Sequence, residues 1–256
     1  MYNLALFIIY LFVFVFGVCI GSFLNVVIYR LPNNISIAKG HSYCPICKTN
    51  IKYRDLVPLL SFIFLKGKCR NCKTKISLRY PVIELITGFF SLLCAYKFNF
   101  TLNALVVFLL LCALIAIFFI DLDTMTIPDE LILFLCLIAL IYPFIFPNTN
   151  LLPNIIGFFS ISLPMLLINF LVKESFGGGD IKLIAVCGFI LGWQRCLLAF
   201  FISLVTACII CVYLLCSKKE NLKSHIPFGP HLCIGIFIAL FYGSEIIKMY
   251  LSCFGL

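Results

Sequence analysis

Eight long runs of apolar residues dominate this chain of 256 residues. They cover roughly residues 4–24, 82–98, 101–120, 131–147, 154–172, 181–194, 196–216 and 231–251. A lipid bilayer accepts this much apolar surface, and a helix needs about 20 such residues to cross it. The runs are too long and too uniformly apolar for barrel strands. Because 63% of all residues are hydrophobic and 11% are charged, we predict an all-α polytopic membrane protein with about eight transmembrane helices. The sixth run is short, so a tilted or broken helix is expected there.

The positive charges predict how these helices are oriented. If the N-terminus lies outside, the segments 30–79, 121–130, 173–182 and 217–230 are cytosolic and hold 16 of the 19 Lys and Arg residues. Cytosolic loops of membrane proteins carry such an excess. We therefore expect the N-terminus outside and the segment 30–79, with 11 of the cations, in the cytosol. This topology accounts for the basic segment without a nucleic acid partner and leaves the lipid bilayer as one partner.

Two Cys-x-x-Cys pairs lie in this basic loop, Cys44 with Cys47 and Cys69 with Cys72, separated by 21 residues. A loop of this size is too small to bury a self-sufficient core and commonly recruits a metal. Two such pairs supply four thiolates to one tetrahedral zinc ion, and an iron–sulfur cluster is the alternative. We predict a zinc-ribbon-like module over residues 30–81, after a first span at 1–29 and before a membrane-embedded domain at 82–256.

Two carboxylates lie where apolar runs end or begin. Asp121 ends the third run, and Asp180 precedes the sixth, after three glycines. By the topology above, both lie at the cytosolic boundary of the membrane, where carboxylates are costly and often functional. Two facing carboxylates can share one proton, so that one activates water and the other polarises a carbonyl. In the structural alternative, Asp121 belongs to a polar loop and Asp180 caps a helix; the residues alone leave both readings open.

A series of motifs then makes a family resemblance specific. In chain order they are GSFLNVVIYRLP (21–32), CPIC, LKGKCRNC, YPVIEL, IDLDTMTIPDEL, GGGDIKL and IPFGPHL, which ends at residue 232. The series resembles the bacterial prepilin peptidases, a family of aspartic membrane proteases. The resemblance implies cleavage of the basic leader of type IV prepilins or pseudopilins after a Gly. It also implies a location in the bacterial cytoplasmic (inner) membrane, with the active site facing the cytosol.

The resemblance also implies residue roles. Asp121, followed by Pro128, matches the first catalytic aspartate, and Asp123 is the fallback for this role. Asp180 matches the second, which closes a Gly-x-Gly-Asp motif; the supporting residues are Gly177, Gly179 and Lys182.

Members of this family that carry the cysteine module also N-methylate the new N-terminal residue with S-adenosylmethionine. The module is present here, so a second, methyltransferase activity is implied. LKGKCRNC resembles the methylation-linked region, which points to Gly67 and Lys68. A turn before the second cysteine pair explains the same two residues equally well.

Two rival classes explain part of the sequence. An ion- or proton-coupled transporter would use acids at the ends of spans and a helix broken by glycines, but it gives the zinc-binding module no role. A membrane anchor with a zinc-binding interaction module gives Asp121 and Asp180 no role.

Overall fold

The computed structural model describes residues 2–146, 150–172, 175–217 and 226–253. Two of the predicted cytosolic loops therefore lie partly outside the described residues, at 173–174 and 218–225.

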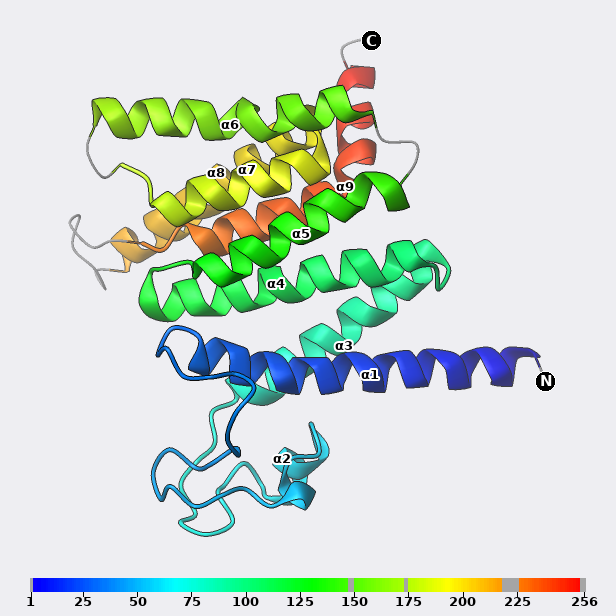
Figure 1. The fold of residues 1–256 in the computed structure, drawn as a ribbon, viewed down its shortest axis with the longest axis vertical. Helices are drawn as coiled ribbons and strands as arrows, with labels where there is room; N and C mark the ends of the chain where they lie inside the picture. The colour runs from blue at the N-terminus through cyan, green and yellow to red at the C-terminus, as the bar shows by residue number, and fades with distance from the viewer. Residues whose placement is uncertain (1, 147–149, 173–174, 218–225, 254–256) are drawn as a thin grey trace. The chain divides into compact units, whose positions relative to one another are not determined.

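Helices account for almost all regular structure in the described part of the chain (Figure 1). Each apolar run coincides with one helix, and a 3-10 turn and a short helix are added in the basic module. The elements are α1 (Tyr2–Arg30), η1 (Tyr53–Asp55), α2 (Leu60–Phe64), α3 (Arg79–Phe98), α4 (Leu102–Thr124), α5 (Asp129–Ile145), α6 (Leu151–Leu171), α7 (Gly178–Leu191), α8 (Trp193–Cys216) and α9 (Gly229–Cys253).

Six of these helices, rather than about eight, are long and apolar enough to cross a membrane among the described residues: α1, α3, α4, α6, α8 and α9. Helices α5 and α7 have 17 and 14 residues. At 1.5 Å per residue they reach about 26 and 21 Å, less than the roughly 30 Å hydrocarbon core. The short sixth run was expected, and α7 does end early, at Leu191, before Gly192, whose φ of +78° is left-handed. Helix α5 has the same length as its apolar run, 131–147.

The chain divides into two compact units, Met1–Ala116 and Ile117–Leu256, and the boundary falls inside α4. In the first unit, α1 and α3 pack along small residues. A Cβ atom on Gly21 would lie 2.7 Å from the Cα of Glu84, and one on Gly17 would lie 2.9 Å from the Cα of Gly88. Glycines allow two helix backbones to approach this closely inside a membrane. The side-chain amide of Asn25 also donates to the carbonyl of Tyr80, at 3.2 Å.

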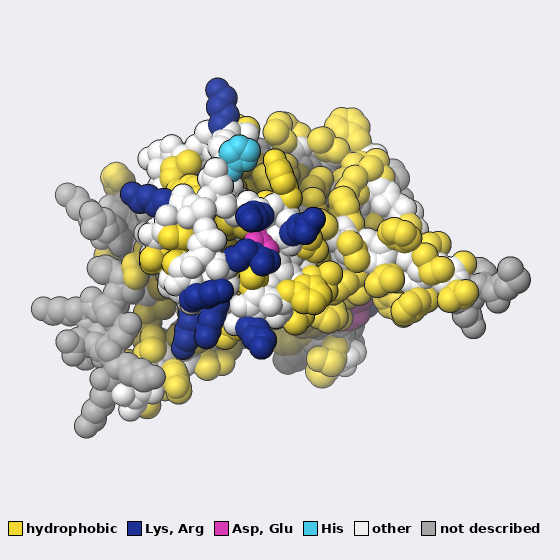
Figure 2. All heavy atoms as spheres, turned by 90° about the horizontal axis from the view of Figure 1, so that it is seen from below, with side chains coloured by type: hydrophobic (Ala, Val, Ile, Leu, Met, Phe, Trp, Pro, Cys, Tyr) yellow, Lys and Arg dark blue, Asp and Glu magenta, His cyan; other side chains and the backbone are white. Residues whose placement is uncertain are grey.

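The basic module, residues 31–78, connects these two helices. In the described residues of the module, the β-structure is limited to the isolated bridges Tyr43↔Asn50 and Lys68↔Lys75. Arg30, the last residue of α1, is buried and donates to the backbone carbonyls of Ser36, Lys39 and His41 at 2.8–3.2 Å. Figure 2 shows that Lys and Arg side chains gather on the face of the molecule that the module forms.

In the second unit, helices also cross at glycines. A Cβ atom on Gly188 of α7 would lie 2.3 Å from the carbonyl oxygen of Gly157 in α6, and one on Gly235 of α9 would lie 2.2 Å from the carbonyl oxygen of Ala199 in α8. Around these crossings, large side chains are fully buried, among them Leu135, Met165, Leu183, Ile184, Leu232 and Ile236. The unit is a packed helical bundle whose helix ends are fixed in position, and both aspartates lie at such ends.

Candidate active site and metal centre

Asp121 lies in the last turn of α4 and is 4% exposed. Its Oδ2 atom accepts a hydrogen bond from the backbone N–H of Gly229, at 3.0 Å. Gly229 is the first residue of α9, and the free N–H groups at a helix N-terminus carry partial positive charge. This contact favours an ionised Asp121.

Gly229 is a site residue that the sequence analysis missed. A Cβ atom at this position would lie 2.6 Å from Oδ2 of Asp121, so only glycine lets the start of α9 approach the carboxylate this closely. The available signal was Gly229-Pro230 in the IPFGPHL motif, because Pro is favoured in the first turn of a helix. Nothing in that motif indicated which side chain the helix start would contact.

Asp180 lies in the first turn of α7 and is half-buried. Its Oδ1 atom is buried without a hydrogen-bond partner among the described residues. Helix α7 is not one of the six candidate spans. Burial, together with the negative charge of Asp121, raises the pKa of Asp180 to about 7. Both effects disfavour a charged carboxylate, so Asp180 takes up a proton more readily than a solvent-exposed aspartate.

The three glycines before Asp180 have different surroundings. A Cβ atom on Gly179 would lie 2.8 Å from the Cβ of Ile127, in the segment between α4 and α5. One on Gly177 would lie 3.0 Å from Oδ2 of Asp180, whereas one on Gly178 would meet nothing within 4 Å. Gly179 therefore lets the start of α7 pack against the segment that follows Asp121, and Gly177 leaves room for the Asp180 carboxylate.

A small network holds the loop before these glycines. The side-chain oxygen of Asn169, in α6, accepts hydrogen bonds from the Phe176 backbone N–H and the Ser175 hydroxyl, and its amide nitrogen donates to the Phe176 carbonyl, all at 2.7–2.9 Å. The ring of Phe176 contacts that of Phe228, with centroids 6.1 Å apart. Phe228 directly precedes Gly229, so the two segments that carry the site are in contact.

Three other residues singled out in the sequence, Asp123, Lys182 and Pro128, have different surroundings from the two aspartates. Asp123 is exposed. The ammonium group of Lys182 lies 2.6 Å from Asp129, at the start of α5, and both side chains are exposed. Pro128 precedes α5 with extended backbone.

The described arrangement supplies one base and one acid. An ionised Asp121 can remove a proton from water, and a protonated Asp180 can donate a hydrogen bond to a carbonyl oxygen. The charge of Asp121 acts on Asp180, although the two residues lie on different helices. The packing of the bundle therefore sets the distance between them.

The four cysteines of the module come together as predicted. The sulfur atoms of Cys44, Cys47, Cys69 and Cys72 all lie within 4.8 Å of one another, and those of Cys44 and Cys72 are 3.8 Å apart. Thiolates bound at about 2.3 Å to one tetrahedral zinc ion are about 3.8 Å from each other. An iron–sulfur cluster would hold its cysteines farther apart. The donor set therefore fits a single zinc ion.

Both cysteine pairs lie in turns with the same backbone pattern. The N–H of Cys44 donates to the carbonyl of Thr49 and the N–H of Lys48 donates to the carbonyl of Cys44; the residues 25 positions later make the same two bonds, at 2.8 and 3.1 Å. Lys48 and its counterpart also share a left-handed φ of 54–59°. The repeated Cys-Lys-Thr is visible in the sequence but was not among the predicted features.

The threonines of this repeat contact the cysteines. The hydroxyl of Thr74 lies 3.1 Å from the sulfur of Cys72 and lowers the pKa of that thiol to about 6. Thr49 likewise lowers the pKa of Cys47. Thiolates are the metal-binding form of cysteine, so the second cysteine of each pair takes this form more readily than a free thiol.

Gly67 and Lys68 lie just before the second turn. Gly67 has a left-handed φ of +66°, and a Cβ atom there would lie 3.0 Å from the ring of Phe62. Its carbonyl accepts the N–H of Ile76, at 2.7 Å. Gly67 therefore sets the path of the chain between α2 and the second cysteine pair.

Comparison with known families places the chain among membrane peptidases. The model of the bacterial peptidase A24 N-terminal domain matches residues 15–98, and that of the type IV leader peptidase family matches residues 108–212. Relatives named prepilin leader peptidase/N-methyltransferase occur in Aeromonas salmonicida (strain A449), Legionella pneumophila and Bacillus subtilis (strain 168). The first two are 34% identical to this chain and the third is 30% identical. The matches cover 94%, 95% and 93% of this chain, in the same order. They cover 93%, 94% and 96% of the relatives' own lengths. No solved structure matches.

Multi-pass helices and a peptidase domain define a membrane-embedded peptidase. The chain belongs to the type IV leader peptidase family. It is therefore an enzyme of the bacterial inner membrane, as the motif series predicted, and the family favours a peptidase over the transporter hypothesis.

Proposed function

We propose that this chain cleaves the basic leader of type IV prepilins or pseudopilins after a Gly residue, with Asp121 and Asp180 as the catalytic pair. The names of the relatives support the substrate class. The observation that carries the assignment is the electrostatic pairing of the two acids: Asp180 lies in the field of Asp121, and Asp121 accepts a hydrogen bond from the N–H of Gly229 at the start of α9. With all eight apolar helices crossing the membrane, the cation count supports a site that faces the cytosol, with the N-terminus outside.

The two carboxylates would divide the chemistry of peptide hydrolysis. Asp121 removes a proton from water, and the resulting hydroxide forms a bond to the carbonyl carbon while Asp180 donates a hydrogen bond to the carbonyl oxygen. The carbon–nitrogen bond then breaks, and the proton held by Asp121 moves to the leaving amine. No covalent enzyme intermediate is formed. Lys182, through Asp129, and the glycines 177 and 179 act as positioning residues for this pair.

The test is cleavage of a prepilin by protein purified in detergent. Asp121→Asn and Asp180→Asn should each lower the rate about 1,000-fold or more, because each removes a proton-transfer group. Asp123→Asn is the matched control, since this side chain is exposed on the same helix, and it should cut normally. Full activity in Asp121→Asn with loss in Asp123→Asn would move the first catalytic role to Asp123.

We further propose that the chain N-methylates the new N-terminal residue with S-adenosylmethionine, as the names of the relatives suggest. The lone pair of the free amine attacks the methyl carbon, the carbon–sulfur bond breaks and leaves S-adenosylhomocysteine, and the amine releases one proton. The zinc ion has a structural role in this proposal. Gly67 and Lys68 support methyl transfer indirectly, because Gly67 fixes the positions of Phe62 and Ile76.

A further inference from the structure

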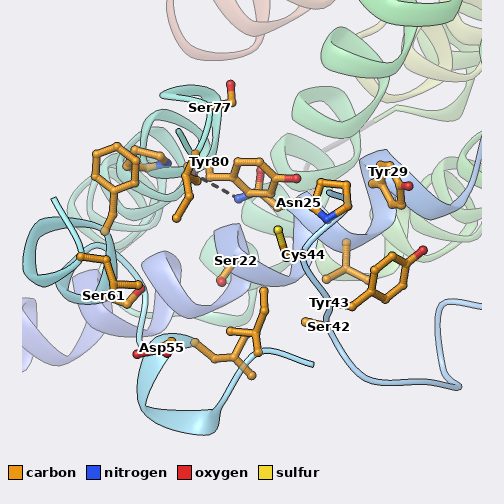
Figure 3. Close-up of a pocket in the computed structure, with 18 of the residues that line it drawn as sticks. Ser22, Asn25, Tyr29, Ser42, Tyr43, Cys44, Asp55, Ser61, Ser77 and Tyr80 are labelled. Atoms are coloured by element: carbon orange, nitrogen blue, oxygen red, sulfur yellow. Dashed lines mark hydrogen bonds between the residues drawn. The ribbon is translucent and has the colours of Figure 1, made fainter. Parts of the chain in front are cut away.

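The first unit contains a cavity of about 460 Å³ between the module and the helices α1 and α3. Figure 3 shows residues of both helices and of the module around it, with Asn25 and Tyr80 joined by their hydrogen bond. Pockets that bind drug-sized ligands have volumes of about 300–1,000 Å³ and are mostly apolar with a few polar groups. The cavity has this size and character, and no role described above uses it.

The wall carries four charged side chains, Arg30, Asp55, Lys75 and Glu84, and the first two have clear partners. Arg30 donates to three backbone carbonyls. Asp55 forms a two-point ion pair with Arg70, at 2.6 and 2.8 Å. Glu84 differs, because it is 7% exposed and is paired with no cation among the described residues. In the described part of the chain, the cavity thus presents one buried carboxylate without a positive partner.

The module reaches this carboxylate with its backbone. The N–H of Leu59 donates to Oε2 of Glu84, at 2.8 Å, and Leu59 has a left-handed φ of +59°. A bulky residue in this region is strained, and such strain often occurs at functional sites. The tyrosines 29, 43 and 80 line the same cavity, and aromatic faces attract cations.

We propose that this cavity binds S-adenosylmethionine, with the carboxylate of Glu84 facing the positive charge of the ligand. The donor is drug-sized, carries a sulfonium and an ammonium group, and has a flat adenine ring that suits the apolar and aromatic wall. The side-chain nitrogen of Asn25 donates hydrogen bonds to the carbonyls of Gly21 and Tyr80. The side-chain oxygen of Asn25 can then accept a hydrogen bond from the ligand. Phe62 and Ile76 also line the cavity, so Gly67 acts on this site from outside it. The inference rests on the proposed methyl transfer.

The test is equilibrium binding of labelled S-adenosylmethionine to the full-length protein in detergent. Val26→Trp fills the cavity from α1 and should weaken binding more than tenfold. Glu84→Gln keeps an oxygen for the Leu59 N–H but removes the charge, and should weaken binding about tenfold. The matched controls are Val15→Trp, at a half-exposed position of the same helix, and Glu245→Gln, in the second unit. Both should bind like the wild type.

Prepilin cleavage by each variant reports on folding, because the proposed catalytic pair lies in the second unit, and all four should cut normally. If the wild type binds the donor and Val26→Trp and Glu84→Gln bind equally well, the cavity assignment is wrong while methyl transfer stands. If the wild type binds no donor, both proposals fail. Equal loss of binding in Val15→Trp and Val26→Trp would also overturn the assignment, since the effect would not come from the cavity.

Discussion

The two units of this protein build their sites in opposite ways. The cysteine site of the first unit comes from two short turns with one backbone pattern, each complete within about six residues. The acid site of the second unit joins the end of α4, the start of α7 and the start of α9, so residues far apart in the chain must meet. Local geometry determines the first site, whereas helix packing determines the second. Changes at one should therefore leave the other largely intact, and four experiments test this separation.

The largest expected effect separates the two activities in one variant. Asp180→Asn should lower prepilin cleavage about 1,000-fold or more, because it removes the proton donor. Offered a precleaved pilin with a free N-terminal residue, the same variant should transfer a labelled methyl group at a rate close to that of the wild type. Loss of both activities in a variant with a normal circular dichroism spectrum would show that the two sites are not independent.

The next effect concerns the metal. Purified wild-type protein should hold about one zinc ion per chain, and Cys44→Ser should lose it together with methyl transfer, because three thiolates hold zinc less well than four. Cleavage should change much less. Cys19→Ser, at an exposed position of α1, is the control and should keep its metal. Elemental analysis that finds no zinc, or an iron charge-transfer band, in the wild type would contradict the assignment.

A smaller effect is expected at the start of α9. Gly229→Ala places a methyl group 2.6 Å from Oδ2 of Asp121, and a displacement of a catalytic group by about 1 Å can cost about 100-fold in rate. Gly178→Ala adds the same methyl group where nothing lies within 4 Å and should cut almost normally. The ratio of the two cleavage rates measures how strictly packing sets the site. Equal rates would mean that Gly229 has no role in positioning Asp121.

The smallest effect is the dependence of cleavage on pH. Asp180 must hold its proton, and its pKa is about 7, so the rate should fall as the pH rises through 7. At pH 8 it should be about tenfold below its plateau at lower pH. Methyl transfer needs a free amine and should not decline over this range. A cleavage rate that rises up to pH 8 would exclude Asp180 as the acid.

The sequence singled out candidate residues for both sites, for physical reasons that differ. Cys44, Cys47, Cys69 and Cys72 were predictable because ligand type and spacing define a metal site on their own. Asp121 and Asp180 stood out because a carboxylate beside an apolar run is costly and needs a reason. Both predictions depend on the chemistry of a single side chain.

Residues that act through shape were not predictable. Gly229 and Asn169 belong to the acid site only because α9 and α6 pack where they do, and neither carries an unusual charge. The count of spans has another cause. The apolar run at 131–147 was counted as a span although it has only 17 residues, the same number as α5.

The paired turns of the module also set an order of events during synthesis. Cys44 and Cys47 leave the ribosome while only α1 is available to enter the membrane, and two thiolates cannot complete a tetrahedral shell. The ion can be enclosed only after Cys72 has emerged, 25 residues after Cys47, and by then α3 is the next segment to appear. If the module binds zinc, capture therefore cannot precede the exit of Cys72, and a chain made without zinc would have its first two membrane helices joined by a loop that no metal closes.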